Sequence, residues 1–190
     1  MSSEEVKQKI VLAAIECMEM YGRANVTIRK IAKRANVNSA AISYYFGGRE
    51  NILDMVMRQT LSNAFNISEF IPYETNDIKA YLKAVFVHLI QGAGRWPNIS
   101  KAHFYDIYTN ADYHSPVTDA LNGFLKELYL KVGHKTALSE EVLKRRIFIL
   151  MSQVIYFVIS PKLLQDFSPV TDAEEFVNDL VDTVFFEGKV

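Results

Sequence analysis

The segment from Thr27 to Phe46, TIRKIAKRANVNSAAISYYF, constrains this chain more than any other. Its apolar residues recur at helical spacing in both halves: Ile28, Ile31, Ala32 and Ala35, then Ile42 and Phe46. Thr27 can cap a first helix, and Asn36 tolerates the left-handed conformation that ends one. Asn38 or Ser39 can cap a second helix. The pattern predicts a helix-turn-helix, whose second helix enters the major groove of DNA.

The outer face of the second predicted helix carries side chains that suit DNA. Ala40 and Ala41 can touch a thymine methyl group, and the hydroxyls of Ser39 and Ser43 can donate or accept hydrogen bonds at base edges. Two tyrosines suit phosphate oxygens, which set register without reading sequence. Gly47-Gly48 precedes a new helix, whose N-terminus favours a phosphate, and a basic residue adds charge there. These last three candidates are Tyr44, Tyr45 and Arg49.

Positive charge is concentrated around this segment, although the whole chain has a net charge of -1. Residues 1–66 contain nine Lys and Arg against six Asp and Glu, a net +3, whereas residues 67–190 contain twelve against sixteen, a net -4. Five basic residues follow one another without an intervening acid: Arg23, Arg29, Lys30, Lys33 and Arg34. Charge alone also fits a solvated helical hairpin. Combined with the turn, it favours phosphate attraction, with Arg29 as a further candidate contact.

The segment from Ile10 to Leu53 resembles the DNA-binding domain of the tetracycline-repressor (TetR) family. The matching residues are Ala13, Ala14, Gly22, Thr27, Ile31, Ala32, Val37, Ile42, Phe46 and Glu50. The resemblance implies an all-helical homodimer whose second, larger domain binds a small molecule. By motif position it places Thr27, Ala41, Ser43, Tyr44, Tyr45 and Arg49 at DNA. Ser43 departs from the family pattern, where Tyr is common, and Tyr44 and Tyr45 can compensate.

The rest of the chain also reads as helical, so we predict an all-α protein of about nine helices. The first helix should cover 3–21, and a long fourth helix should run from Arg49 toward Phe65 without a Gly or Pro. We expect an N-terminal helix-turn-helix domain over 1–48 and a ligand-binding and dimerisation domain over 49–190. Further boundary signals are Thr75 or Asn76, Gly92, Gly94 and Pro97, Ser115-Pro116, Ser139, Pro161 and a capping box at 171–174.

Composition narrows the cellular setting. Cys17 is the only cysteine and follows Ile10, Ala13 and Ala14 on an apolar face, so a core role is favoured over redox sensing. No apolar run reaches the length of a membrane span, and residues 2–9 are polar rather than signal-like. We therefore expect a cytoplasmic protein without a membrane partner.

The last two predicted helices are strongly apolar, and residues 147–151 and 154–159 leave little polar face. A helix of this kind must be covered on more than one side. Both helices could be core elements of one subunit. We favour a homodimer through these two helices, because two recognition helices must be spaced to reach successive major grooves.

Aromatic residues are frequent in the middle helices and can line a pocket for an apolar or aromatic small molecule, although for any single residue an ordinary core position is the favoured interpretation. Our candidates for such an effector site are Trp96, His103, Tyr108 and Met151. The four histidines lack metal-ligand spacing, and His103 with Asp106 makes at most one hydrogen-bonded pair. Phosphate-binding glycine loops and nucleophile motifs are absent from the sequence. We predict no catalytic residue, metal or cofactor, and no enzymatic activity.

These observations favour a ligand-responsive transcriptional regulator, a homodimeric repressor that a small molecule releases from double-stranded operator DNA. The alternative is a DNA-binding regulator without a small-molecule effector, controlled by a protein partner or acting as an activator. A structural or catalytic helical dimer is the alternative without DNA.

Overall fold

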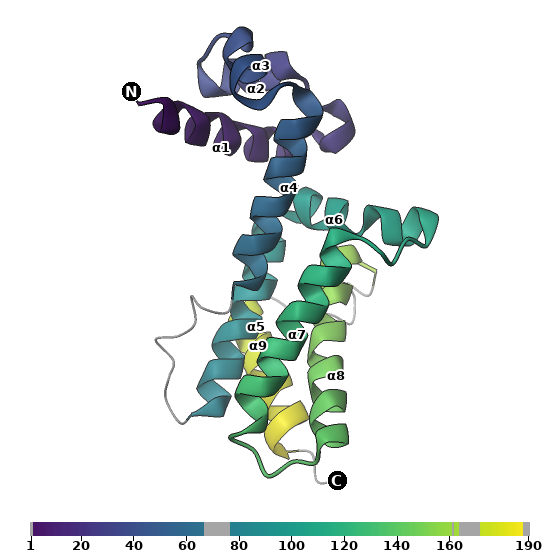
Figure 1. The fold of residues 1–190 in the computed structure, drawn as a ribbon. Coiled ribbons are helices and arrows are strands. Elements are labelled where there is room, and N and C mark those ends of the chain that lie inside the picture. Colours follow the sequence, from purple (N-terminus) through teal and green to yellow (C-terminus); the bar gives the residue numbers. More distant parts are fainter. Residues whose placement is uncertain (1, 67–76, 161, 164–171, 188–190) are drawn as a thin grey trace. The chain divides into compact units, whose positions relative to one another are not determined.

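The computed structural model describes residues 2–66, 77–160, 162–163 and 172–187. Within these ranges the chain forms nine α-helices, a short 3-10 helix and a terminal π-helix, with no strand (Figure 1). The helices are α1 (Ser3–Tyr21), η1 (Arg23–Asn25), α2 (Ile28–Ala35), α3 (Ser39–Phe46), α4 (Arg49–Phe65), α5 (Ile78–Arg95), α6 (Pro97–Asn110), α7 (Pro116–Gly133), α8 (Glu140–Ile159), α9 (Ala173–Val181) and η4 (Asp182–Glu187). The predicted all-α class is confirmed.

The chain divides into two compact units, and each is discontinuous in sequence. The first unit comprises Met1–Asn63 and Trp96–Tyr113, and the second comprises Ala64–Arg95 and His114–Val190. This division differs from the expected boundary after residue 48. The first unit also takes in most of α4 and the whole of α6, because these helices pack with α1 to α3 around one core.

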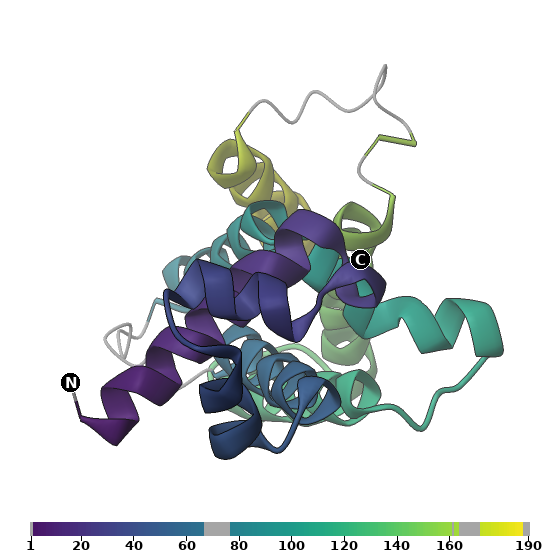
Figure 2. The ribbon, with the colours of Figure 1, turned by 90° about the horizontal axis from the view of Figure 1, so that it is seen from above.

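The first unit is built on α1, which packs against α2 and α6, while α2 packs against α3 (Figures 1 and 2). Apolar residues from all five helices form its core, among them Ile10, Ile31, Ile42, Leu53 and Ile99. Cys17 is 2% exposed in this core, and burial raises the pKa of its thiol above the usual value. The expected core role of Cys17 is confirmed.

A carboxylate from α1 caps the N-terminus of α6. The Glu19 carboxylate accepts hydrogen bonds from the backbone amides of Asn98, at 3.0 and 3.2 Å, and Ile99, at 3.1 Å. The Asn98 side chain in turn donates to the Glu19 carbonyl at 2.7 Å. Trp96, the residue before α6, provides no side-chain cap of its own. Glu19 therefore provides acceptors for amides that would otherwise lack partners at this helix end. Its negative charge also interacts favourably with the partial positive charge of the helix N-terminus.

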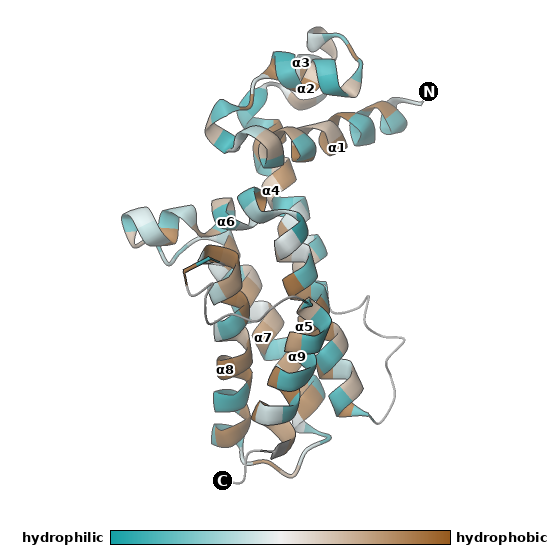
Figure 3. Ribbon diagram, turned by 180° about the vertical axis from the view of Figure 1, so that it is seen from behind, coloured by the Kyte–Doolittle hydropathy of each residue, from teal (hydrophilic) through white to brown (hydrophobic). Residues whose placement is uncertain are grey.

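The second unit is a bundle in which α5 packs against α8 and α9, and α7 packs against α8 (Figure 1). Its core includes Leu82, Phe86, Leu128 and Leu150, each fully buried. Figure 3 shows that hydrophobic residues dominate the C-terminal half of α8. The π-helix η4 is tied to α5 through Asp182, whose carboxylate lies 2.8 Å from the Lys79 ammonium and 3.0 Å from that of Lys83. Hydrogen bonds from these lysines lower the pKa of Asp182.

Most predicted helix boundaries agree with the structure, and two need correction. The expected end of α5 at its glycines is wrong, because the helix continues through Gly92 and Gly94 to Arg95. A Cβ atom at either glycine would meet no other atom, so neither glycine is required by packing. Their effect on the helix is limited to the lower helix propensity of glycine. The N-cap of α9 is Asp172, whose carboxylate accepts from the amides of Glu174 and Glu175. The predicted caps Thr75 and Asn76, together with Pro161 and Thr171, lie outside the described residues.

None of the described helices combines the length and the apolar character that crossing a membrane requires.

Candidate DNA-binding site

Three polar side chains define the ends of α2 and α3. The Thr27 hydroxyl accepts from the Lys30 amide at 3.2 Å and begins α2. Asn36 adopts a left-handed conformation with a φ of 51°, which ends α2 and turns the chain. The Asn38 carboxamide then accepts from the Ala40 amide at 2.8 Å and begins α3. The predicted helix-turn-helix is confirmed, with Asn38 rather than Ser39 as the second cap.

The solvent-facing side of α3 is formed by residues at helical spacing, Ala40, Ser43 and Tyr44. Tyr44 is 83% exposed, and its ring meets that of Tyr45 edge-on with 5.0 Å between the centroids. Ser39, Ala41 and Tyr45 are half-buried at the margins of this face. Ile42 and Phe46 point the other way into the core, as predicted. The face is therefore small and polar, with one aromatic side chain extended into solvent.

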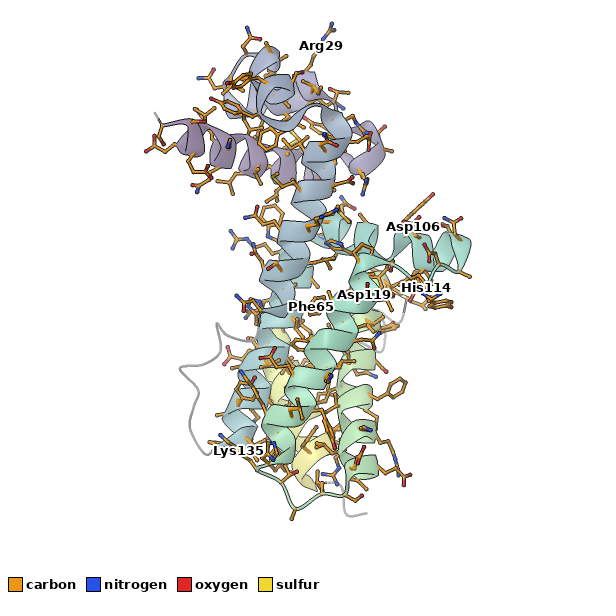
Figure 4. The ribbon with its side chains drawn as sticks, in the orientation of Figure 1. Arg29, Phe65, Asp106, His114, Asp119 and Lys135 are labelled. Atoms are coloured by element: carbon orange, nitrogen blue, oxygen red, sulfur yellow. The ribbon has the colours of Figure 1, made fainter. Side chains whose placement is uncertain are left out.

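Two cations of α2, the helix that packs against α3, are exposed to solvent. Arg29 and Lys33 lie one helical turn apart, are exposed, and have no ionic or hydrogen-bonding partner among the described side chains. Figure 4 shows Arg29 extending away from the helices. The neighbouring cations are engaged, since Lys30 donates to the Asn25 carbonyl at 2.8 Å and Arg34 forms an ion pair with Glu16. Lys33 is missing from our sequence-based candidates, although its four-residue spacing from Arg29 was visible.

Arg49 lies at the start of α4 and binds backbone carbonyls of the segment before α2. Its Nε donates to the Val26 carbonyl at 2.6 Å, and one Nη donates to the Arg23 and Ala24 carbonyls at 2.6 and 3.3 Å. Its other Nη pairs with Glu50. The guanidinium thus fixes η1 and the entry to α2 against α4. Most of its donors are used in this way, so a phosphate contact by Arg49 stays a prediction.

The four candidate effector residues are not brought together within either unit. Trp96 packs half-buried against the first core, and Tyr108 on α6 is 61% exposed. Met151 is buried in the second unit, on α8. An open depression of about 510 Å³ lies along α4 in the first unit, and its lining contains none of the four. The location of an effector site stays a prediction.

His103, the remaining candidate, joins α6 to α4 inside the first unit. Its Nε2 lies 3.0 Å from the Thr60 hydroxyl, which can donate to the Val56 carbonyl at 2.9 Å. The suggested pair with Asp106 is not formed, because Asp106 accepts from Asn110 instead, and Figure 4 shows Asp106 on the outer part of α6. Burial, with a smaller effect of the Arg23 charge, lowers the pKa of His103 to about 4. The imidazole is therefore neutral at physiological pH.

Replacing Arg49 with Lys should lower the free energy of unfolding by about 2 kcal/mol, because an ammonium keeps the charge but cannot bridge three carbonyls. Urea denaturation followed by circular dichroism measures the effect. Arg58→Lys, at an exposed position of the same helix, is the matched control and should behave as wild type. Equal stability of Arg49→Lys and wild type would show that the carbonyl contacts contribute nothing.

Stability should fall as the pH decreases from about 6.5 to about 4, because the unfolded chain binds a proton at His103 that the folded chain excludes. Between pH 4 and pH 6.5 the free energy of unfolding should rise by up to about 3 kcal/mol because of this site, and above pH 6.5 the site adds no further change. His103→Gln should flatten this part of the profile of melting temperature against pH. His134→Gln, at an exposed histidine, should leave it unchanged. An unaltered profile for His103→Gln would contradict the assignment.

Comparison with known proteins adds independent information on the N-terminal region. The regulator BetI 1 of Chromohalobacter salexigens is 42% identical over 55 residues, which are 29% of this chain and 27% of that protein. The dual regulator CecR of Shigella flexneri is 43% identical over 49 residues, 26% of this chain and 22% of that protein. Each alignment thus spans less than a third of either protein.

Solved structures extend the similarity to the fold of the whole chain. A tetR-family transcriptional regulator from Streptomyces coelicolor aligns with a TM-score of 0.68 and 16% identity, over 97% of this chain and 80% of that chain. FadR from Bacillus subtilis, in complex with stearoyl-CoA, aligns with a TM-score of 0.66 and 17% identity, over 96% of this chain and 100% of that chain. At these identities the likeness establishes the fold alone.

The family model described as bacterial regulatory proteins, tetR family, matches residues 10–56. This range begins in α1 and ends in α4, and it includes both helices of the helix-turn-helix with their caps. The family residues that we identified in the sequence, from Ala13 to Glu50, all fall within it. Residues 10–56 thus match the tetR family of bacterial regulatory proteins, and the fold of α1 to α9 is similar to that of a solved tetR-family regulator.

Proposed function

We propose that this protein is a transcriptional regulator that binds operator DNA as a homodimer, acts as a repressor and is released by a small molecule. The observation that carries the proposal is the solvent-facing side of α3, which is uncharged, together with two exposed cations of the adjacent helix α2, Arg29 and Lys33, for which the described residues provide no partner. An uncharged helix surface can approach base edges closely, while adjacent cations attract the phosphates.

The residues divide by the part of the DNA that they would contact. Ala40, Ala41 and Ser43, with Ser39 at the margin, are of a size and type that suits base edges. The hydroxyl of Tyr44 is the most extended group on this face, and it suits a phosphate oxygen. By motif position Thr27 and Tyr45 fall where the family touches DNA, and Arg29 and Lys33 would supply charge. The first group would select the sequence and the others would supply affinity.

The second unit supports dimer formation through α8 and α9. One side of α8 is buried in the subunit core, whereas Phe148 is 68% and Ile149 is 38% exposed on another side. Ile155, Tyr156 and Ile159 continue this side at helical spacing and are half-buried. The rings of Phe157 and Phe176 lie 4.9 Å apart and connect α8 with α9. Burying such a surface against its copy gives the two-fold symmetry that paired half-sites require.

An apolar effector is supported by two observations. The core of the second unit is formed by aliphatic and aromatic side chains of α5, α7 and α8. A fold of this kind holds stearoyl-CoA in the FadR structure. A molecule that weakens operator binding must itself bind the operator complex more weakly by the same factor, typically ~1–3 kcal/mol in coupling free energy.

Ser43→Ala should change sequence preference, whereas Arg29→Ala should weaken binding to all sequences about equally. Wild-type protein first selects duplexes from a random pool, and fluorescence anisotropy then measures affinity for the selected duplex and its single-base variants. We expect Ser43→Ala to alter discrimination at one base pair by about 1–3 kcal/mol.

Lys126→Ala, at an exposed position of α7, is the control and should leave affinity and preference unchanged. Failure of the wild-type protein to enrich any duplex would refute DNA binding. A uniform loss of affinity for Ser43→Ala, without a change in preference, would remove Ser43 from the base-reading group.

Phe148→Glu should convert the dimer to a monomer, because it places a charge in the proposed apolar interface. Sedimentation equilibrium at micromolar concentration measures the mass. Tyr108→Glu is the matched control, since Tyr108 is similarly exposed but lies on α6. A dimer that persists in Phe148→Glu would place the interface elsewhere.

A further inference from the structure

The exposed face of α3 has no charge of its own. Its sequence, SAAISYYF, contains neither an acidic nor a basic residue. A helix in the major groove lies between two phosphate backbones, and phosphate contacts fix its orientation. Positive charge for both backbones must therefore come from neighbouring helices.

Few cations of the helix-turn-helix region are available for that purpose. Arg23 pairs with Asp54 at 2.8 Å, and Arg34 pairs with Glu16. Lys30 and Arg49 donate to backbone carbonyls. Arg29 and Lys33 are available, but both belong to α2 and lie on the same side of that helix.

Lys7 of α1 brings a further cation to α3 from a different helix. Its ammonium lies over the ring of Tyr45, 5.9 Å from the centroid. The Tyr45 ring contacts that of Tyr44, which is 83% exposed. Lys7, Tyr45 and Tyr44 thus form a continuous row from α1 to the solvent-facing side of α3. A tyrosine face attracts an ammonium group and keeps it near this position.

The competing partner of Lys7 is weak. The ammonium lies 3.9 Å from the Glu4 carboxylate, and both side chains are exposed, at 42% and 70%. Exposed pairs at this separation contribute little and are screened by salt. A phosphate close to Tyr44 would compete with Glu4 for the same ammonium.

We propose that Lys7 is a DNA phosphate contact, which forms with Tyr45 and Tyr44 a second anion-binding edge of the recognition surface. The cation reaches the phosphate beside Tyr44, and the Tyr45 ring positions it. This inference rests on the proposed function, because the phosphate belongs to the duplex that α3 would read.

The test compares the salt dependence of DNA binding by Lys7→Met, Lys7→Arg and wild type, each as the whole 190-residue chain. The probes are the duplex selected by the wild-type protein and a random 30-base-pair duplex. Each lost phosphate contact lowers the magnitude of the salt slope by about 0.9. A dimer loses two such contacts, one from each subunit, so its slope should fall by about 1.8. Between 50 and 200 mM salt, wild type should then lose roughly tenfold more affinity than Lys7→Met. Lys7→Arg should keep the wild-type slope, and base preference should be the same in all three.

Lys9→Met is the matched control, since Lys9 lies on the same helix and forms no hydrogen bond, ion pair or cation–π contact with α3 among the described residues. An unchanged slope for Lys7→Met, or an equal change for Lys9→Met, would overturn the assignment while wild-type binding stands. Absence of binding by wild type would overturn the proposed function as well. Melting curves of the variants check that the fold is intact.

Discussion

The two helices of the helix-turn-helix are too short to be stable on their own. Helices α2 and α3 have eight residues each, and isolated helices shorter than about 12–15 residues are marginal in water. Their stability must come from the core that they share with α1, α4 and α6. Arg49 adds to this by joining the carbonyls before α2 to the start of α4. The short helices can therefore devote their outer faces to small and polar residues.

The parts of this architecture that are local in sequence were predictable. Thr27, Asn36 and Ser139 act at helix ends within a few residues of their partners, and their side chains disclose those ends. The apolar spacing of α3 separated Ile42 and Phe46 from the exposed Ser43 and Tyr44 in the same way.

The contacts that join distant segments were not predictable. Arg49 reads as a free cation at a helix N-terminus, but its acceptors are carbonyls 23 to 26 residues earlier. His103 reads as a pocket residue or a partner of Asp106, but its partner is Thr60 on another helix. Residue type and spacing indicate on which face of its helix a polar side chain lies. Which polar group it binds depends on how the helices pack. The location of an effector site does not follow from the sequence for the same reason.

The cap that Glu19 places on α6 has a consequence for how the protein can be divided. The chain leaves the first unit near residue 63, builds α5 in the second, and returns at Trp96 to supply α6. A fragment cut after α4 would keep the helix-turn-helix but leave the Glu19 carboxylate without the amides of Asn98 and Ile99. It would also expose the core surface that Ile99 covers. The unit that contains the helix-turn-helix is therefore assembled from two separate segments of the chain, and a fragment that preserves its core must include both.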